Sequence, residues 1–283
     1  MSRRSALTAR AAVVAGVVAL GAAAAGITAA AAAPSHQGAR PDRTAKPTIV
    51  LVHGAWADSS GWNDEITRLT HLGYPVLTES TPLRGLTSDA DHLRARLQTI
   101  SGPIVLVGHS YGGAVITNAA RGVPNVKALV YAAAFVPAAN ESLQMILAEH
   151  PGSHIDGTKL DVVPVANAAA DGGQDADLYI KPADFRDIFA GDVSAQRSAL
   201  EAATQRPLAN TAFAQLSGAP AYADVPSWDL ISLDDHAIPA SAQLFMARRA
   251  GAHLESIHSA HDIMISHPTA VEHLIIEAAN AVS

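Results

Sequence analysis

The segment Gly-His-Ser-Tyr-Gly at residues 108–112 constrains the fold of this chain more than any other part of the sequence. It directly follows the apolar run Ile-Val-Leu-Val at 104–107, and residues 112 to about 120 are typical of a helix. A strand that enters Gly-x-Ser-x-Gly and leaves as a helix turns so sharply that only glycine fits beside the serine, whose hydroxyl is presented above the sheet edge. The pattern predicts this turn, a nucleophile elbow, with Ser110 as the nucleophile. The alternative is a chance Gly/Ser turn.

Apolar runs and amphipathic stretches alternate along most of the chain, which predicts an α/β fold with a mostly parallel sheet and helices on both of its faces. The expected strands are 48–52, 75–78, 104–107, 126–132, 228–233 and 253–257, and the expected helices are 62–72, 88–100, 112–120, 241–250 and 268–281. The alternation stops at about 137–225, a stretch rich in Ala, Asp, Pro and Gly. We expect one domain over 47–283 with a mainly helical cap inserted at about 137–225.

The first 33 residues have the pattern of an export signal peptide. A basic opening with the pair Arg3-Arg4 precedes a run at 11–33 that contains only Ala, Val, Gly, Leu, Ile and one Thr. The paired arginines favour the twin-arginine route, and the small residues at 29–33 offer cleavage sites. The run is also long enough for a retained membrane anchor, but alanine is weakly apolar and a polar stretch follows, so we expect removal. Residues 34–46 are predicted to be a disordered lead-in.

The charge of the chain limits its partners. The whole chain carries a formal net charge of -7, and removal of three arginines with residues 1–33 makes it -10. An acidic surface argues against nucleic acid and against stable membrane association after signal removal. The chain has no cysteine, so an exported form would have no disulfides and would depend on core burial for its stability. We therefore expect a secreted or cell-envelope protein whose partner is a small molecule.

A serine nucleophile needs a base, and the base needs an acid that orients it. In this architecture the acid and the base follow the nucleophile in that order, each just beyond a strand end. The loop after the last strand holds His258 and His261, and we favour His261 because it lies further into the loop. The turn after 228–233 holds Asp234 and Asp235, and we favour Asp235 for the same reason.

Two other histidines lie close to the predicted site. His53 ends the first strand and is expected to shape the neighbouring loop, and His109 inside the elbow is expected to be structural. The charge that develops on the carbonyl oxygen requires main-chain N–H donors. We assign these donors to Tyr111, which follows the nucleophile, and to Ala55 in the loop after the first strand.

The remaining patterns are weaker. His258, His261 and Asp262 lack the further spaced ligands of a metal site, and residues 171–177 lack the glutamate that closes a calcium loop, so the sequence predicts no metal and no cofactor. The aromatic residues Trp56, Trp62 and Phe135 are candidates for a substrate pocket, although aromatic side chains more often belong to the core.

Several motifs together resemble a known family. They are His-Gly-Ala-Trp at 53–56 with Gly-Trp at 61–62, the elbow at 108–112, Asp-His-Ala-Ile-Pro at 235–239 and His-Asp-Ile-Met at 261–264. From about residue 48 to the C-terminus, and most weakly across the cap, the chain resembles the α/β-hydrolase branch of plant methylesterases, hydroxynitrile lyases and related bacterial serine esterases. The resemblance implies that Asp235 rather than Asp234 is the acid, and that Ala55 and Tyr111 supply the oxyanion donors.

One departure from this family bears on the reaction. The resembling lyases carry a lysine directly after the catalytic histidine, where this chain has Asp262. A negative charge there would oppose an anionic leaving group, which favours ester hydrolysis. The expected function is an exported serine carboxylesterase that acts on small, largely apolar esters through an acyl-enzyme. The alternatives are a hydroxynitrile-lyase-like enzyme on the same residues and a non-catalytic ligand-binding relative.

Overall fold

The computed structural model describes residues 46–282. The expected signal peptide at 1–33 and nearly all of the expected lead-in at 34–46 lie outside the described residues, so both stay predictions.

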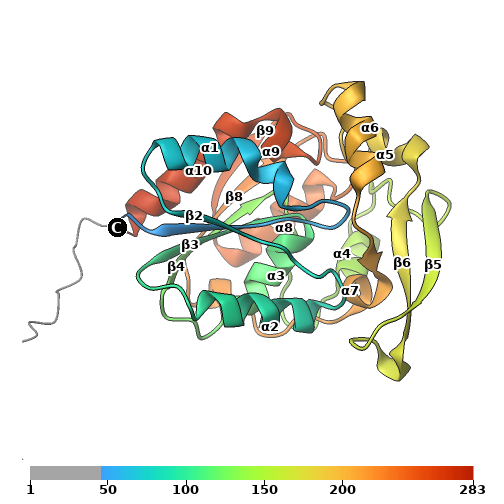
Figure 1. Cartoon of the computed structure of the whole chain (residues 1–283), viewed down its shortest axis with the longest axis horizontal. Coiled ribbons are helices and arrows are strands. Elements are labelled where there is room, and N and C mark those ends of the chain that lie inside the picture. The colour runs from blue at the N-terminus through green and yellow to red at the C-terminus, as the bar shows by residue number, and fades with distance from the viewer. Residues whose placement is uncertain (1–45, 283) are drawn as a thin grey trace, which may run out of the picture. The chain divides into compact units, whose positions relative to one another are not determined.

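Within residues 46–282, the main sheet has six strands in the order β2-β1-β3-β4-β8-β9 (Figure 1). Every neighbouring pair is parallel. The strands are β1 Thr48–Val52, β2 Val76–Glu79, β3 Ile104–His109, β4 Val126–Ala132, β8 Ser227–Ser232 and β9 His253–Ile257. This arrangement confirms the predicted α/β-hydrolase fold with a mostly parallel sheet.

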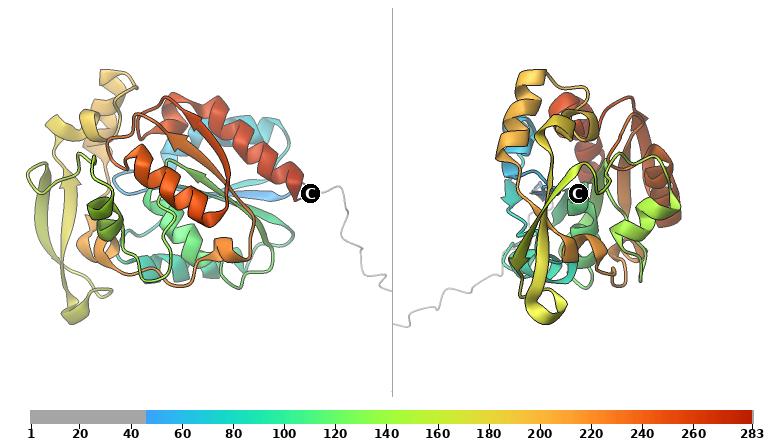
Figure 2. Two further views of the ribbon diagram at one scale, coloured as in Figure 1. Left: turned by 180° about the vertical axis from the view of Figure 1, so that it is seen from behind. Right: turned by 90° about the vertical axis from the view of Figure 1, so that its right-hand side faces the viewer.

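Helices cover both faces of this sheet, as Figures 1 and 2 show. The main-sheet helices are α1 Asn63–His71, α2 Leu86–Leu97, α3 Tyr111–Ala119, α8 Ala240–Ala250, α9 Ile263–Ser266 and α10 Pro268–Ala281. Successive strand residues point to opposite faces, so Ile49 packs in the core layer of α1 and α10, whereas Val50 packs in the layer of α2, α3 and α8. Burial on both faces explains why the central strands are continuous apolar runs.

The chain between β4 and β8 forms the cap, which lies beyond one end of the main sheet (Figure 1). Its elements are α4 Leu143–Glu149, β5 Leu160–Ala166, β6 Gln174–Ile180, α5 Pro182–Ile188, α6 Ala195–Thr204, β7 Leu208–Ala209 and α7 Asn210–Ala214. The strands form an antiparallel sheet in the order β5-β6-β7, which the expectation of a mainly helical cap did not include. Most of β5 faces solvent, so its sequence lacks the apolar alternation of a half-buried strand.

The longest helix among residues 46–282 is α10, with 14 residues. No helix in this range has both the length and the apolar character that a membrane span requires.

Candidate active site

Ser110 lies at a sharp turn between β3 and α3. Its backbone has φ 53° and ψ −124°, a region in which a residue with a side chain is strained by about 1–3 kcal/mol. The turn brings the start of α3 against β1, because a Cβ atom at Gly112 would lie 2.6 Å from the carbonyl oxygen of Val52. Only glycine permits this approach. The structure therefore has the strand–turn–helix geometry that the motif predicts.

His261 lies in the loop after β9 and faces Ser110. The Ser110 hydroxyl donates a hydrogen bond to Nε2 of His261, with an Oγ–Nε2 distance of 2.8 Å. The imidazole is fully buried, so bulk water does not compete for this contact. The pair is a nucleophile and a base within direct proton-transfer distance.

Asp235, in the loop after β8, holds the other side of the imidazole. Its Oδ2 accepts from Nδ1 of His261 at 2.7 Å and from Nε2 of Gln243 at 2.7 Å. Its Oδ1 accepts from the main-chain N–H groups of Ala237 and Ile238 at 2.7 and 2.8 Å. Four donors fix the carboxylate, and the carboxylate fixes the tautomer in which Nε2 of His261 is free to accept the serine proton.

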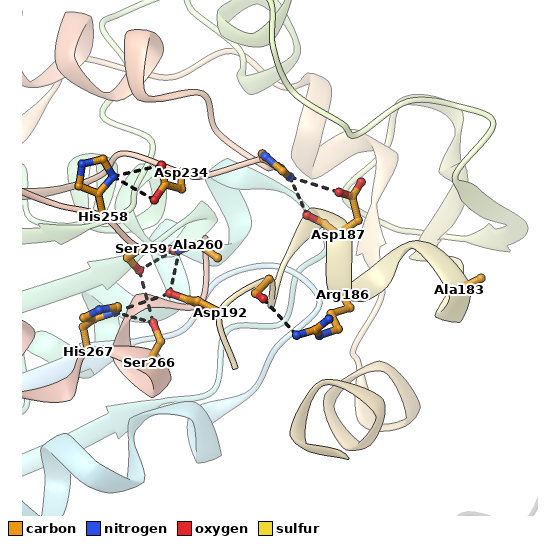
Figure 3. Close-up of a pocket in the computed structure, with 12 residues that line it drawn as sticks. Ala183, Arg186, Asp187, Asp192, Asp234, His258, Ser259, Ala260, Ser266 and His267 are labelled. Atoms are coloured by element: carbon orange, nitrogen blue, oxygen red, sulfur yellow. Dashed lines mark hydrogen bonds and ion pairs between the residues drawn. The ribbon is translucent and has the colours of Figure 1, made fainter. Parts of the chain in front are cut away.

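His258 and Asp234, the alternative candidates for the base and the acid, form a pair of their own. Nδ1 of His258 lies 3.1 Å from Oδ2 of Asp234, and their side chains are 80% and 60% exposed. Figure 3 shows this pair among the residues that line a surface groove, and Ser110 does not belong to that lining. The structure thus brings Ser110, His261 and Asp235 together and places His258 and Asp234 on the surface.

Tyr111 directly follows the serine, and Ala55 belongs to the loop that packs against it. Both residues are buried, and within residues 46–282 neither N–H has an acceptor. The loop that carries Ala55 lies directly against the nucleophile, because a Cβ atom at Gly54 would come within 2.6 Å of Cβ of Ser110. Buried N–H groups without acceptors are rare, and two beside one hydroxyl can stabilise an oxyanion.

His53 supports the loop that carries Ala55. Nδ1 of His53 donates to the carbonyl oxygen of Gly54 at 2.8 Å, and its Nε2 accepts from the N–H of Thr81 at 3.1 Å. Burial lowers the pKa of His53 to about 4, so the ring is neutral at physiological pH. His53 therefore shapes the loop, as the sequence suggests.

His109 supports the base. Its Nε2 donates to the carbonyl oxygen of His261 at 2.9 Å, and the centroids of the two rings lie 4.7 Å apart. Burial lowers the pKa of His109 well below its usual range, with the nearby imidazole of His261 as a second cause. The side chain is structural, as expected, and its specific role is to position the loop of His261. No sequence signal indicates that contact, because the two residues are 152 positions apart.

The three candidate pocket residues lie in different surroundings. Trp56 lies under the cap, where its Nε1 donates to the carbonyl oxygen of Leu178 in β6 at 2.7 Å. Phe135 follows β4, and its N–H donates to the carbonyl oxygen of Ser110 at 3.1 Å. Trp62 is fully buried in the core layer of α1 and α10, which favours a structural role, and its assignment to a pocket wall stays a prediction.

Phe189, at the end of α5, is a site residue that the sequence did not single out. Its ring centroid lies 4.9 Å from that of His261 in an edge-to-face arrangement, and its carbonyl oxygen accepts from the N–H of Asp262 at 3.0 Å. The cap thus contacts the base directly. The only sequence signal is the Phe-x-x-Ile-Phe pattern at 185–189 within an otherwise polar stretch.

The surroundings of Asp262 disfavour the negative charge that the sequence suggests. Its side chain is buried, and this burial, followed by repulsion from Glu201, raises the pKa of Asp262 well above its usual range. Glu201 is ion-paired with Arg197 in α6. Burial thus favours the uncharged form of Asp262 under the cap, which weakens the expectation that a negative charge here opposes an anionic leaving group.

Comparisons with known proteins agree with this geometry. The model of the alpha/beta hydrolase family matches residues 49–274. A carbendazim-hydrolysing esterase from Nocardioides sp. (strain SG-4G) is 37% identical over 112 residues, which are 35% of this chain. The match covers 46% of that relative, so the chain spans about half its length.

Two further proteins match over most of their length. An alpha/beta hydrolase from Aspergillus novofumigatus (strain IBT 16806) is 25% identical over 258 residues, 83% of this chain and 97% of the relative. The crystal structure of polyneuridine aldehyde esterase superimposes with a TM-score of 0.70 at 19% identity, and the match covers 82% of this chain and 98% of that one. A likeness at this identity establishes a shared fold.

Proposed function

Because the chain belongs to the alpha/beta hydrolase family, we propose that it is an exported serine esterase that hydrolyses small, largely apolar carboxylic esters. The observation that carries this proposal is the continuous hydrogen-bonded series from Oγ of Ser110 through the imidazole of His261 to the carboxylate of Asp235. Esterase activity in the Nocardioides relative supports the same reaction class.

The proposed reaction has two halves. In the first, Oγ of Ser110 attacks the ester carbonyl carbon while its proton moves to Nε2 of His261. Asp235 stabilises the resulting imidazolium, and the N–H groups of Ala55 and Tyr111 bind the oxyanion. The tetrahedral intermediate collapses as Nε2 returns the proton to the leaving alcohol, which leaves the acyl group on Ser110. In the second half, water gives a proton to Nε2 as its oxygen attacks the acyl carbon. The second tetrahedral intermediate collapses as Nε2 returns that proton to Oγ of Ser110, which releases the acid and restores the serine hydroxyl.

The surroundings of the serine support a small, apolar substrate. Ser110 is only 4% exposed, and Phe189 of the cap lies edge-to-face against the imidazole of His261 beside it. Phe189 and Phe135 are also buried here, and they provide apolar contact area near the reacting atoms. A substrate with few polar groups loses little hydration when it enters such a site.

The sequence of residues 1–33 supports export, because a paired-arginine opening and a long apolar run precede small residues suited to cleavage. N-terminal sequencing of the exported protein tests this part of the proposal. A mature chain that starts close to residue 34 is expected, and a chain that retains Met1 would contradict cleavage.

Substitution of the nucleophile tests the reaction. Ser110→Ala removes the attacking oxygen and only one hydrogen bond, so hydrolysis of a short p-nitrophenyl ester should fall by about 10⁴-fold or more with the fold retained. Circular dichroism and thermal melting provide the control for folding. Turnover within tenfold of the unsubstituted protein would contradict the assignment of Ser110 as the nucleophile.

A further inference from the structure

Three side chains outside the catalytic site converge where the cap meets the main domain. His154 follows α4, Asp187 belongs to α5, and His236 follows β8 immediately after Asp235. Nδ1 of His154 lies 2.8 Å from Oδ2 of Asp187, and Nδ1 of His236 lies 3.3 Å from Oδ1 of the same carboxylate. One ligand atom from each residue lies within 4.8 Å of the other two.

The backbone holds the two imidazoles in position. The N–H of His154 donates to the carbonyl oxygen of His236 at 2.7 Å, and the ring centroids are 4.0 Å apart. Nδ1 of His236 also lies 3.0 Å from the carbonyl oxygen of Asp187. The two rings, tilted by 32° to each other, therefore present the same nitrogen to one carboxylate, and an ion among the three groups would replace the present hydrogen bonds of Nδ1.

We propose that His154, Asp187 and His236 bind a divalent transition-metal ion, best matched by Zn²⁺, which ties the cap to the loop of the catalytic acid. Two imidazole nitrogens and one carboxylate oxygen are ligands that suit Zn²⁺, and three protein ligands leave a fourth position for water. Each neutral ring carries its proton on Nε2 in the bound form, which frees Nδ1 for the metal. The sequence predicted no metal, because these ligands are spread over 83 positions and only the fold unites them.

The groove beside these residues supports an exchangeable site. Figure 3 shows Asp187 at the rim of a surface groove that also contains the His258–Asp234 pair and, further along, Asp192 and His267. The side chains of His154, Asp187 and His236 are 38%, 48% and 45% exposed, so an ion can enter without unfolding. The His258–Asp234 pair has no third ligand among the metal-competent groups of residues 46–282, which makes it a matched control.

Lys159 provides a second, independent test. Its Nζ lies 3.3 Å from Oδ2 of Asp187, so a cation of the chain itself is next to the carboxylate that would ligate the metal. Metal binding must displace this ammonium group. Lys159→Gln removes the competing charge and should tighten Zn²⁺ binding by up to about fivefold, the range of exposed ion pairs.

Isothermal titration calorimetry with Zn²⁺ on the chelator-treated, untagged protein tests the proposal. We expect one bound ion per chain, at least about 100-fold weaker binding in His154→Ala and Asp187→Asn, and unchanged binding in His258→Ala. Thermal melts of the metal-free proteins show whether each variant folds. Three results would each overturn the site: no Zn²⁺ binding to the unsubstituted protein, binding in either ligand variant as tight as in the unsubstituted protein, or a loss in His258→Ala as large as in the ligand variants.

Hydrogen exchange separates a metal that ties the two parts together from one that merely binds. Zn²⁺ should slow amide exchange in α5 and in residues 234–239 of the unsubstituted protein, and it should have no such effect in His154→Ala. Exchange rates in both segments that do not change with Zn²⁺ would overturn the proposed connection between cap and acid loop.

Discussion

Two aspartate–histidine pairs connect the same two loops of this molecule, and they have opposite surroundings. Asp235 and His261 are fully buried at 2.7 Å, whereas Asp234 and His258 lie on the surface at 3.1 Å. The loops are held in register by the main-chain bond from the N–H of Asp234 to the carbonyl oxygen of Ser259, so both pairs have a similar framework. Asp234 and Asp235 are adjacent in the loop after β8, yet the first side chain is exposed and the second is buried.

The difference shows what the chemistry requires beyond a close pair. The exposed pair is screened by water and has only two members, so it contributes little. The buried pair has a third member in Ser110, and Gln243 and two main-chain N–H groups fix its carboxylate. The imidazole between a fixed acceptor and a hydroxyl can move a proton, whereas the imidazole on the surface has no proton donor to activate.

The largest expected effect comes from removing each imidazole in turn. His261→Ala should lower kcat for a p-nitrophenyl ester by about 10⁶-fold, because the serine proton then has no acceptor. His258→Ala should change kcat by less than twofold. Steady-state kinetics on both variants measures the contrast, and a comparable loss in the two would break the distinction between the pairs.

Substitution of the two aspartates should change kcat by a smaller factor than substitution of the histidines. In Asp235→Asn an amide N–H replaces the oxygen that accepts from Nδ1, so the ring of His261 adopts the other tautomer and Nε2 can no longer accept a proton. We expect kcat to fall by about 10⁴-fold, with Asp234→Asn close to the unsubstituted protein.

The pH dependence of the residual rate is the control for the Asp235→Asn variant. Hydroxide can replace the missing base, so the rate should keep rising at alkaline pH. A loss in Asp234→Asn as large as that in Asp235→Asn would contradict the assignment that both the family resemblance and the geometry support.

The smallest effect concerns Asp262, which is buried beside the buried pair but does not belong to it. Its raised pKa means that the folded protein retains a proton that the unfolded chain loses, so stability falls as pH rises above the usual aspartate range. Asp262→Asn should raise the melting temperature by about 3 °C or more at pH 7, with no gain at pH 3, where the side chain is neutral in both states.

Activity of the same variant sharpens the comparison. If burial keeps Asp262 uncharged, Asp262→Asn should change kcat by less than threefold at pH 7. A pH-independent melting difference, or a large change in kcat, would show that Asp262 is ionised in the folded protein.

The sequence identifies the catalytic residues because each lies in a turn or loop that directly follows a strand. The elbow follows an unmistakable apolar strand, and the acid and base loops follow strands with clear signals, so Ser110, Asp235 and His261 could be proposed from the sequence. Asp235 directly follows its alternative Asp234, and His261 lies three residues after its alternative His258. The choice between them therefore rested on position in the loop and on the family resemblance.

Features that depend on contacts between distant segments could not be predicted in this way. Trp62 looks like a pocket residue in the sequence, but the layer of α1 and α10 buries it. Asp262 looks charged in the sequence, but burial in the fold and the nearby Glu201 of α6 raise its pKa. The cap sheet has no clear signature in the sequence, because β5 is largely exposed to solvent and contains Pro164, so no apolar period marks it.

The most direct test of the account is active-site labelling with a fluorophosphonate, which reacts only with an activated serine. Peptide mass spectrometry should locate the label at Ser110, with labelling much slower in His261→Ala and as fast in His258→Ala as in the unsubstituted protein. Absence of label at Ser110, or an equal slowing in the two histidine variants, would contradict the claim that the buried pair alone activates this serine.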